Sequence, residues 1–177
     1  MAEPSFEFPY VSKLWAWARG APGKRTFYLQ VSDDSRWLRI WLEKEELLTL
    51  STAVEGLLKN LGQEEGTAER AKKDVESEEE PSDEPTAEFK LGQLTLDYEE
   101  ENKVISMGIH EADSDFKGSP TVLLRAKPSQ MQSFRRRIGE ICAAGRPLCI
   151  LCKSPIDPEG HMCIRGNGHR SLTDIQQ

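Results

Sequence analysis

The sequence predicts an α+β fold in which duplicated β-β-β-α units form a mostly antiparallel sheet with two helices, followed by a small zinc-ribbon-like knuckle. Three observations predict it: short segments of alternating apolar residues, two longer segments with helical apolar spacing, and a C-terminal group of cysteines and a histidine. We divide the chain into a first unit (1–62), an acidic disordered linker (63–88), a second unit (89–145) and a zinc-binding tail (146–177).

The first unit contains three predicted strands and one helix. The strands cover Val11–Arg19, Thr26–Val31 and Arg36–Glu43, and sequences rich in Pro, Gly, Asp and Ser separate them. The helix covers Lys44–Leu61 and ends at Gly62, a common C-terminal stop signal. Its expected buried stripe consists of Leu47, Leu50, Val54, Leu57, Leu58 and Leu61.

The second unit repeats this order. Strands are predicted over Phe89–Tyr98, Lys103–Ala112 and Thr121–Arg125, and a helix over Pro128–Ala144. The alternation of leucines breaks near Gly92, which predicts a β-bulge there. The helix should bury Met131, Phe134, Ile138 and Ile141. We expect the two units to share one sheet, related by a pseudo-twofold axis.

Charge is distributed unevenly along the chain, whose net charge is −7. Residues 63–88 carry 11 acidic and 3 basic residues and few large apolar side chains, so we expect a solvated linker. The linker could also compete with an acidic partner for the basic C-terminal segment. Residues 120–177 carry nine basic and four acidic residues. This basic half raises the alternative of RNA or DNA binding through Arg135, Arg136, Arg137, Arg165 and Arg170.

Four potential metal ligands lie within fifteen residues: Cys149, Cys152, His161 and Cys163. A Cys-x-x-Cys pair on a turn, joined by a Pro/Gly-rich loop to a second pair, can surround a zinc ion tetrahedrally. Three thiolates and one imidazole leave no open position, so we expect a structural zinc site. His169 is an alternative fourth ligand, and a redox-active or free thiol pair is an alternative to metal binding.

Other residues allow less specific hypotheses. Cys142 lies on the apolar side of the second helix, where a buried, inert thiol is expected. The four tryptophans are expected in the core, with an exposed apolar patch as the alternative. An enzyme site would have to combine Arg25, Glu43 and His110 with the closing segment, and no spacing selects such a site.

Several stretches resemble an uncharacterised bacterial family labelled domain of unknown function 3090 (DUF3090), over nearly the whole chain. They are Gly20–Gln30, Leu42–Lys44, Ala143–Cys152 and Asp157–Gly168. In this resemblance His161 and Cys163 occupy the family's His-x-Cys pair. The family usually has an aromatic residue at the position of His169 and a threonine at that of Lys127. The resemblance implies a fold and no activity.

Taken together, these observations predict a non-catalytic protein-interaction or adaptor module with structural zinc. Sequence motifs for phosphate loops, nucleophile elbows and zinc proteases are missing, so an enzyme is the less favoured alternative. The N-terminus carries no basic and apolar segment typical of a secretory signal, and we expect a cytoplasmic protein without a membrane span.

Overall fold

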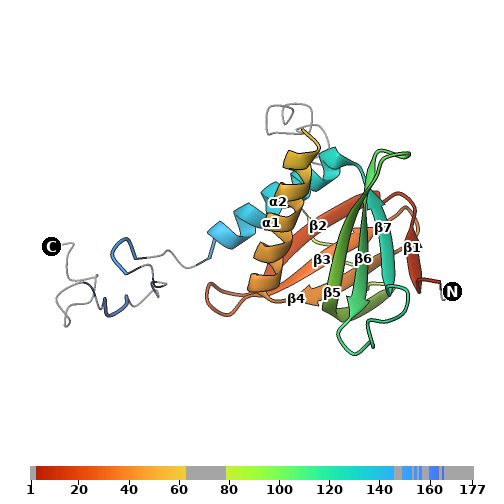
Figure 1. Ribbon diagram of the computed structural model, residues 1–177. Helices are drawn as coiled ribbons and strands as arrows, with labels where there is room; N and C mark the ends of the chain where they lie inside the picture. The colour runs from red at the N-terminus through yellow and green to blue at the C-terminus, as the bar shows by residue number, and fades with distance from the viewer. Residues whose placement is uncertain are drawn as a thin grey trace.

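The computed structural model describes residues 3–62 and 79–145, and within the C-terminal segment residues 149–152, 154, 156, 160–163 and 165. The described residues form seven strands and two helices, which confirms the α+β class (Figure 1). In chain order they are β1 (Phe6–Phe8), β2 (Lys13–Arg19), β3 (Thr26–Ser32), β4 (Trp37–Leu42), α1 (Lys44–Asn60), β5 (Ala87–Glu99), β6 (Val104–Glu111), β7 (Val122–Ala126) and α2 (Pro128–Ala143).

The strands form one mixed, mostly antiparallel sheet in the order β1-β7-β6-β5-β4-β3-β2. Four neighbouring pairs are antiparallel, and β4–β5 and β1–β7 are parallel. Four strands precede α1 and three strands lie between α1 and α2. The six predicted strands and both helices are present, and their predicted boundaries agree with the structure within two residues. That the two halves are copies of one ancestral unit stays a prediction.

The two edges of the sheet meet where β1 leads into β2. Val11 N–H donates to the carbonyl of Arg125 at the end of β7 (3.0 Å), and Ser12 N–H donates to the carbonyl of Ser32 in β3 (2.8 Å). The sheet therefore curls back on itself. The first strand of each half pairs in parallel with the last strand of the other half, which is the pairing that a twofold relation would produce.

Both helices pack on the same side of the sheet and contact each other, α1 lying over β3 and α2 along β2 (Figure 1). Their apolar stripes and the inward residues of the strands form one core. Helix residues Leu47, Val54, Met131, Phe134 and Ile138 are all fully buried. The predicted stripes are confirmed, with Leu57 and Leu61 only partly buried at the margin of the core.

The bulge predicted at Gly92 is confirmed. The pairing of β5 with β6 shifts register between Leu91 and Gln93. A Cβ atom at Gly92 would lie 2.7 Å from the Cα atom of Ala112 and 2.8 Å from the carbonyl oxygen of Glu111. Glycine is therefore required here because the backbones of β5 and the chain leaving β6 approach too closely for a side chain.

Helix α2 begins without a hydroxyl cap, and Gln130 replaces it. The Oε1 atom of Gln130 accepts a hydrogen bond from Lys127 N–H (2.9 Å), while its Nε2 atom donates to the Val11 carbonyl (2.9 Å). One side chain thus satisfies a free amide at the helix start and ties the helix to the point where the sheet edges meet.

The structure differs from the sequence prediction in two places. Strand β1 was not predicted, because it has three residues and its partner β7 lies more than a hundred residues later. The acidic linker was predicted to be solvated to residue 88, yet β5 begins at Ala87, and Glu80 and Asp83 bond to side chains of the sheet. The prediction is corrected for residues 79–88, and residues 63–78 lie outside the described residues.

Candidate metal centre

The candidate metal centre lies in the segment that follows α2. Cys149 and Cys152 stand on one turn, which closes with a hydrogen bond from Cys149 N–H to the carbonyl of Ser154 (2.8 Å). The chain returns through Gly160, whose φ of +93° is a backbone conformation that favours glycine. His161 and Cys163 follow directly, so the second pair of ligands is brought back to the first.

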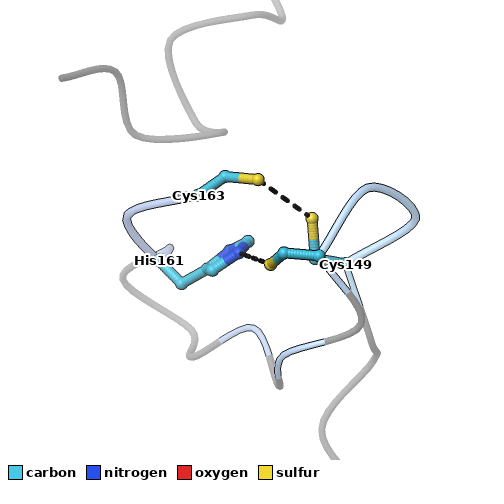
Figure 2. A group of neighbouring side chains, drawn as sticks. Cys149, His161 and Cys163 are labelled. Atoms are coloured by element: carbon cyan, nitrogen blue, oxygen red, sulfur yellow. Dashed lines mark hydrogen bonds between the residues drawn. The ribbon is translucent and has the colours of Figure 1, made fainter. Parts of the chain in front are cut away.

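The four ligand atoms converge. One atom from each of Cys149, Cys152, His161 and Cys163 lies within 4.8 Å of the others. The sulfurs of Cys149 and Cys163 are 3.7 Å apart, and Cys152 Sγ lies 3.1 Å from His161 Nε2. Figure 2 shows the side chains of Cys149, His161 and Cys163 turned toward a common point. Thiolates bound to one tetrahedral zinc ion lie about 3.8 Å apart, so this spacing fits a shared metal ion.

The sulfur distances exclude a disulfide in this structure. All four cysteines are free thiols. The 3.7 Å between Cys149 and Cys163 far exceeds the roughly 2.05 Å of a sulfur–sulfur bond. The close approach of three sulfurs without a covalent bond is the arrangement expected of metal ligands.

Hydrogen bonds in the turn favour the thiolate form that binds metals. The hydrogen bonds with Ser154, followed by the one with His161, lower the pKa of Cys152 to about 6. Nε2 is the histidine nitrogen that faces Cys152, while Nδ1 is buried and has no partner among the described residues. His161 therefore offers Nε2 as its ligand atom.

The four residues of the cluster differ in their exposure to solvent. Cys149 and Cys163 are buried, while Cys152 and His161 are partly exposed. A tetrahedral ion that bound all four atoms would have no coordination position left for a substrate or a reactive water. The arrangement could hold a metal ion. His169, the alternative ligand, lies outside the described residues.

The other candidate residues are buried in the fold or bonded to its backbone. Cys142 is partly buried beside the core, and burial raises the pKa of its thiol. Arg25 donates to the carbonyl of Ile141 at the end of α2, and Glu43 stands at the N-terminus of α1. His110 is buried in β6 with its ring against Phe116.

The arginines proposed to bind nucleic acid do not form one free surface. Arg135 pairs with Glu55 of α1 at 3.1 Å. Arg137 donates to the Ala16 carbonyl of β2 and lies over two tryptophan rings. Arg136 is exposed, and Arg165 donates to the Leu151 carbonyl within the knuckle. Arg170 lies outside the described residues.

Two features of the molecule were not predicted as candidate sites. The first is the exposure of the apolar residues between the metal ligands, which the Cys-x-x-Cys and His-x-Cys patterns could have indicated. The second is a group of aromatic and basic side chains on β2, β3 and β4, which contacts Glu80 and Asp83 before β5 and Glu88 at its start. The four tryptophans were expected in the core, with an exposed apolar patch as the alternative, and they lie in a second cluster that is separate from the core.

Comparison with known proteins gives a family and no activity. A family model described as a protein of unknown function (DUF3090) matches residues 6–163, a region that ends at the last of the four ligands. No curated protein and no solved structure matches the chain. In the described part of the chain, neither helix combines the length and apolar character needed to cross a membrane.

Proposed function

The chain belongs to the DUF3090 family, and on that premise we propose that it is a non-catalytic protein-interaction module whose C-terminal knuckle is held by structural zinc. We define the knuckle as residues 149–165. In this proposal the barrel-like sheet and its helices form the scaffold. The zinc ion fixes the knuckle, which presents apolar side chains to a partner protein.

The donor set supports zinc as the metal. Three sulfurs and one imidazole nitrogen form a soft set of four, and a tetrahedral arrangement of this kind suits zinc better than magnesium or calcium, which prefer oxygen. The absence of a fifth protein ligand or an open position within this group supports a structural role. A cytoplasmic location fits the four free thiols, since reducing compartments keep cysteines available for metals.

The observation that carries the proposal is the exposure of apolar side chains on the knuckle. Ile150 is 83 % exposed, Met162 70 % and Leu151 46 %. Three of the six large apolar side chains exposed in the described residues thus lie within this short segment. Their neighbours in sequence point at the metal site, so these residues point outward. Fixed apolar side chains in water favour contact with another protein.

Nucleic-acid binding through the basic half is not the function that we propose. Arg135 and Arg137 have intramolecular partners, and binding a phosphate would require breaking or sharing those contacts. Of these arginines, Arg136 and Arg165 are the exposed ones among the described residues, which is a small number of cations for phosphate contacts.

The test is capture of a partner by the zinc-loaded full chain. Replacing Ile150, Leu151 and Met162 together by serine should abolish capture while leaving zinc content and thermal stability unchanged. The control replaces Leu48 and Tyr10 by serine, because these apolar residues are also exposed but lie outside the knuckle. Capture that survives the knuckle substitutions, or that is lost equally in the control, would contradict the proposal.

A further inference from the structure

The face of β2, β3 and β4 opposite the helices carries an unusual set of side chains. Such a face normally carries small polar residues where it meets water. Here five aromatic side chains lie on it, and we call them the aromatic face: Trp15, Trp17, Tyr28, Trp37 and Trp41. Strand register sets them beside one another, with Trp17 opposite Tyr28 and Tyr28 opposite Trp41. Together they form a second apolar cluster, separate from the core.

Basic side chains lie over these rings. The guanidinium of Arg39 is 5.0 Å from the ring centre of Trp37, 5.1 Å from Tyr28 and 5.5 Å from Trp41. Lys13 and Arg137 lie over both Trp15 and Trp17. A cation over an aromatic ring is attracted to it, so Lys13, Arg39 and Arg137 bring positive charge to this face.

An acidic segment of the same chain already occupies this face. We call residues 79–88 the acidic strap. Glu80 accepts hydrogen bonds from Arg19 and from the hydroxyl of Tyr28. Asp83 accepts one from the indole of Trp37 (3.2 Å). Glu88 accepts bonds from Arg39 (3.1 Å) and from the indole of Trp41 (3.2 Å). Each of the three carboxylates thus accepts a hydrogen bond from an aromatic side chain of this face, and Glu80 and Glu88 also accept one from an arginine beside it.

The side-chain contacts of the strap are individually weak, whereas its last two residues, Ala87 and Glu88, belong to β5 and pair with β4. The ion pair of Arg19 with Glu80 leaves the two side chains 45 % and 32 % exposed, and Glu88 is 52 % exposed in its pair with Arg39. Exposed ion pairs contribute little free energy and are screened by salt. An acidic segment with the same pattern can therefore compete with the strap.

The face also has donors that the strap does not use. The indole N–H of Trp15 and the Nε–H of Arg39 are buried without a partner among the described residues. Both residues stand in one row across the sheet, on either side of Gln30. Buried donors normally have acceptors, so the face can accept more carboxylate or carbonyl oxygens than the strap supplies.

We propose that the aromatic face is a binding site for an acidic peptide segment of a partner protein. The part of the strap before its pairing with β4, residues 79–85, is then an internal occupant that such a segment displaces, while Glu88 stays in β5 and releases only its side chain. Carboxylates of the partner would accept bonds from the indoles of Trp37 and Trp41 and from Arg39. This surface is distinct from the zinc knuckle, and the inference does not depend on the function proposed for the knuckle.

A peptide fits this face better than a single-stranded nucleic acid. Nucleic-acid platforms offer open ring faces on which bases stack. Here Tyr28 is fully buried, Trp17 and Trp37 are less than one-tenth exposed, and arginines cover the rings. What the structure shows in place are carboxylates bonded to indole and guanidinium donors.

The test uses the zinc-loaded full chain and a labelled synthetic peptide with the sequence of residues 79–88. In the variant Glu80→Gln/Asp83→Asn/Glu88→Gln the strap keeps its length but loses its charge. This variant should bind the peptide at least about ten-fold more tightly than the wild-type chain, and binding should weaken with added salt. A peptide with Gln and Asn at all acidic positions should not bind, and adding Arg39→Gln to the variant should abolish binding.

Two further measurements keep the test decisive. Asp83→Asn alone changes one exposed carboxylate, and it should give a smaller gain in peptide affinity even if the triple variant does not fold. A ten-nucleotide single strand serves as the competing probe. Folded variants that do not bind the acidic peptide, or that bind the oligonucleotide more tightly than the peptide, would overturn the proposal.

Discussion

Replacing glycine by alanine should change the stability of this fold in opposite directions at two positions. At Gly92 the new Cβ would lie 2.7 Å from the Ala112 Cα atom and 2.8 Å from the Glu111 carbonyl oxygen, and backbone atoms cannot rotate away. At Gly139 in α2, a new Cβ would have no atom within 4 Å apart from its chain neighbours and the nearby backbone of the helix itself. The same substitution therefore introduces a steric clash at the bulge and removes only backbone freedom in the helix.

The expected magnitudes follow from these surroundings. Forcing an extra carbon into a filled space costs about 1–3 kcal/mol, so Gly92→Ala should lower the free energy of unfolding by that amount. Gly139→Ala should raise it by roughly 1 kcal/mol, because alanine favours the helix over glycine by about that much. In a chain of this size, 1 kcal/mol corresponds to a shift of about 2–4 °C in Tm.

Chemical denaturation followed by tryptophan fluorescence measures the free energy of unfolding of both variants. Thermal unfolding followed by circular dichroism measures their Tm as a second test. The free energies of unfolding of the two variants should differ by about 2–4 kcal/mol. This difference tests the reasoning more directly than the change in either variant alone. A neutral Gly92→Ala would show that β5 and β6 do not approach as closely as described. A destabilised Gly139→Ala would contradict the exposed position of that residue on α2.

Three other predictions concern the scaffold. Leu47→Ala should cost about 2–5 kcal/mol because Leu47 is fully buried, whereas Leu48→Ala, at a 44 % exposed neighbour, should change stability by no more than about 0.5 kcal/mol in chemical denaturation. Gln130→Ala should cost about 1–2 kcal/mol, since it breaks the bonds to Lys127 and Val11. Hydrogen bonds led by the Ser35 amide lower the pKa of Asp33 to about 2, so its stabilising effect is present above about pH 4 and is lost as the pH falls through about 2. Unfolding of Asp33→Asn should therefore depend less on pH between about 4 and 2 than unfolding of the wild type, and an equal dependence would contradict the assignment.

The parts of the fold that the sequence predicts well depend on local signals. Helix spacing from Lys44 onward and from Pro128 onward identifies both helices and their buried stripes, and the break at Gly92 identifies the bulge. The four ligands converge as predicted because a short loop joins the two pairs. In each of these cases the interacting residues are close in the chain.

The features that escaped prediction depend on contacts between distant residues. Strand β1 exists because Phe6–Phe8 finds β7, and a three-residue segment has too little periodicity to be recognised. The acidic strap has the composition of a solvated linker. Its Glu80 and Asp83 are ordered by Tyr28 and Trp37, which lie about fifty residues earlier, and composition alone does not reveal such partners.

The central claim is that Cys149, Cys152, His161 and Cys163 hold one zinc ion and that no other residue substitutes for them. The metal content of the purified full chain and of single variants tests it most directly. We predict one zinc per chain, lost on Cys149→Ser, Cys152→Ser, His161→Ala or Cys163→Ser and retained on Cys142→Ser and His169→Ala. A metal-free wild-type chain with a disulfide among these cysteines, or loss of zinc on His169→Ala equal to that on His161→Ala, would contradict the claim.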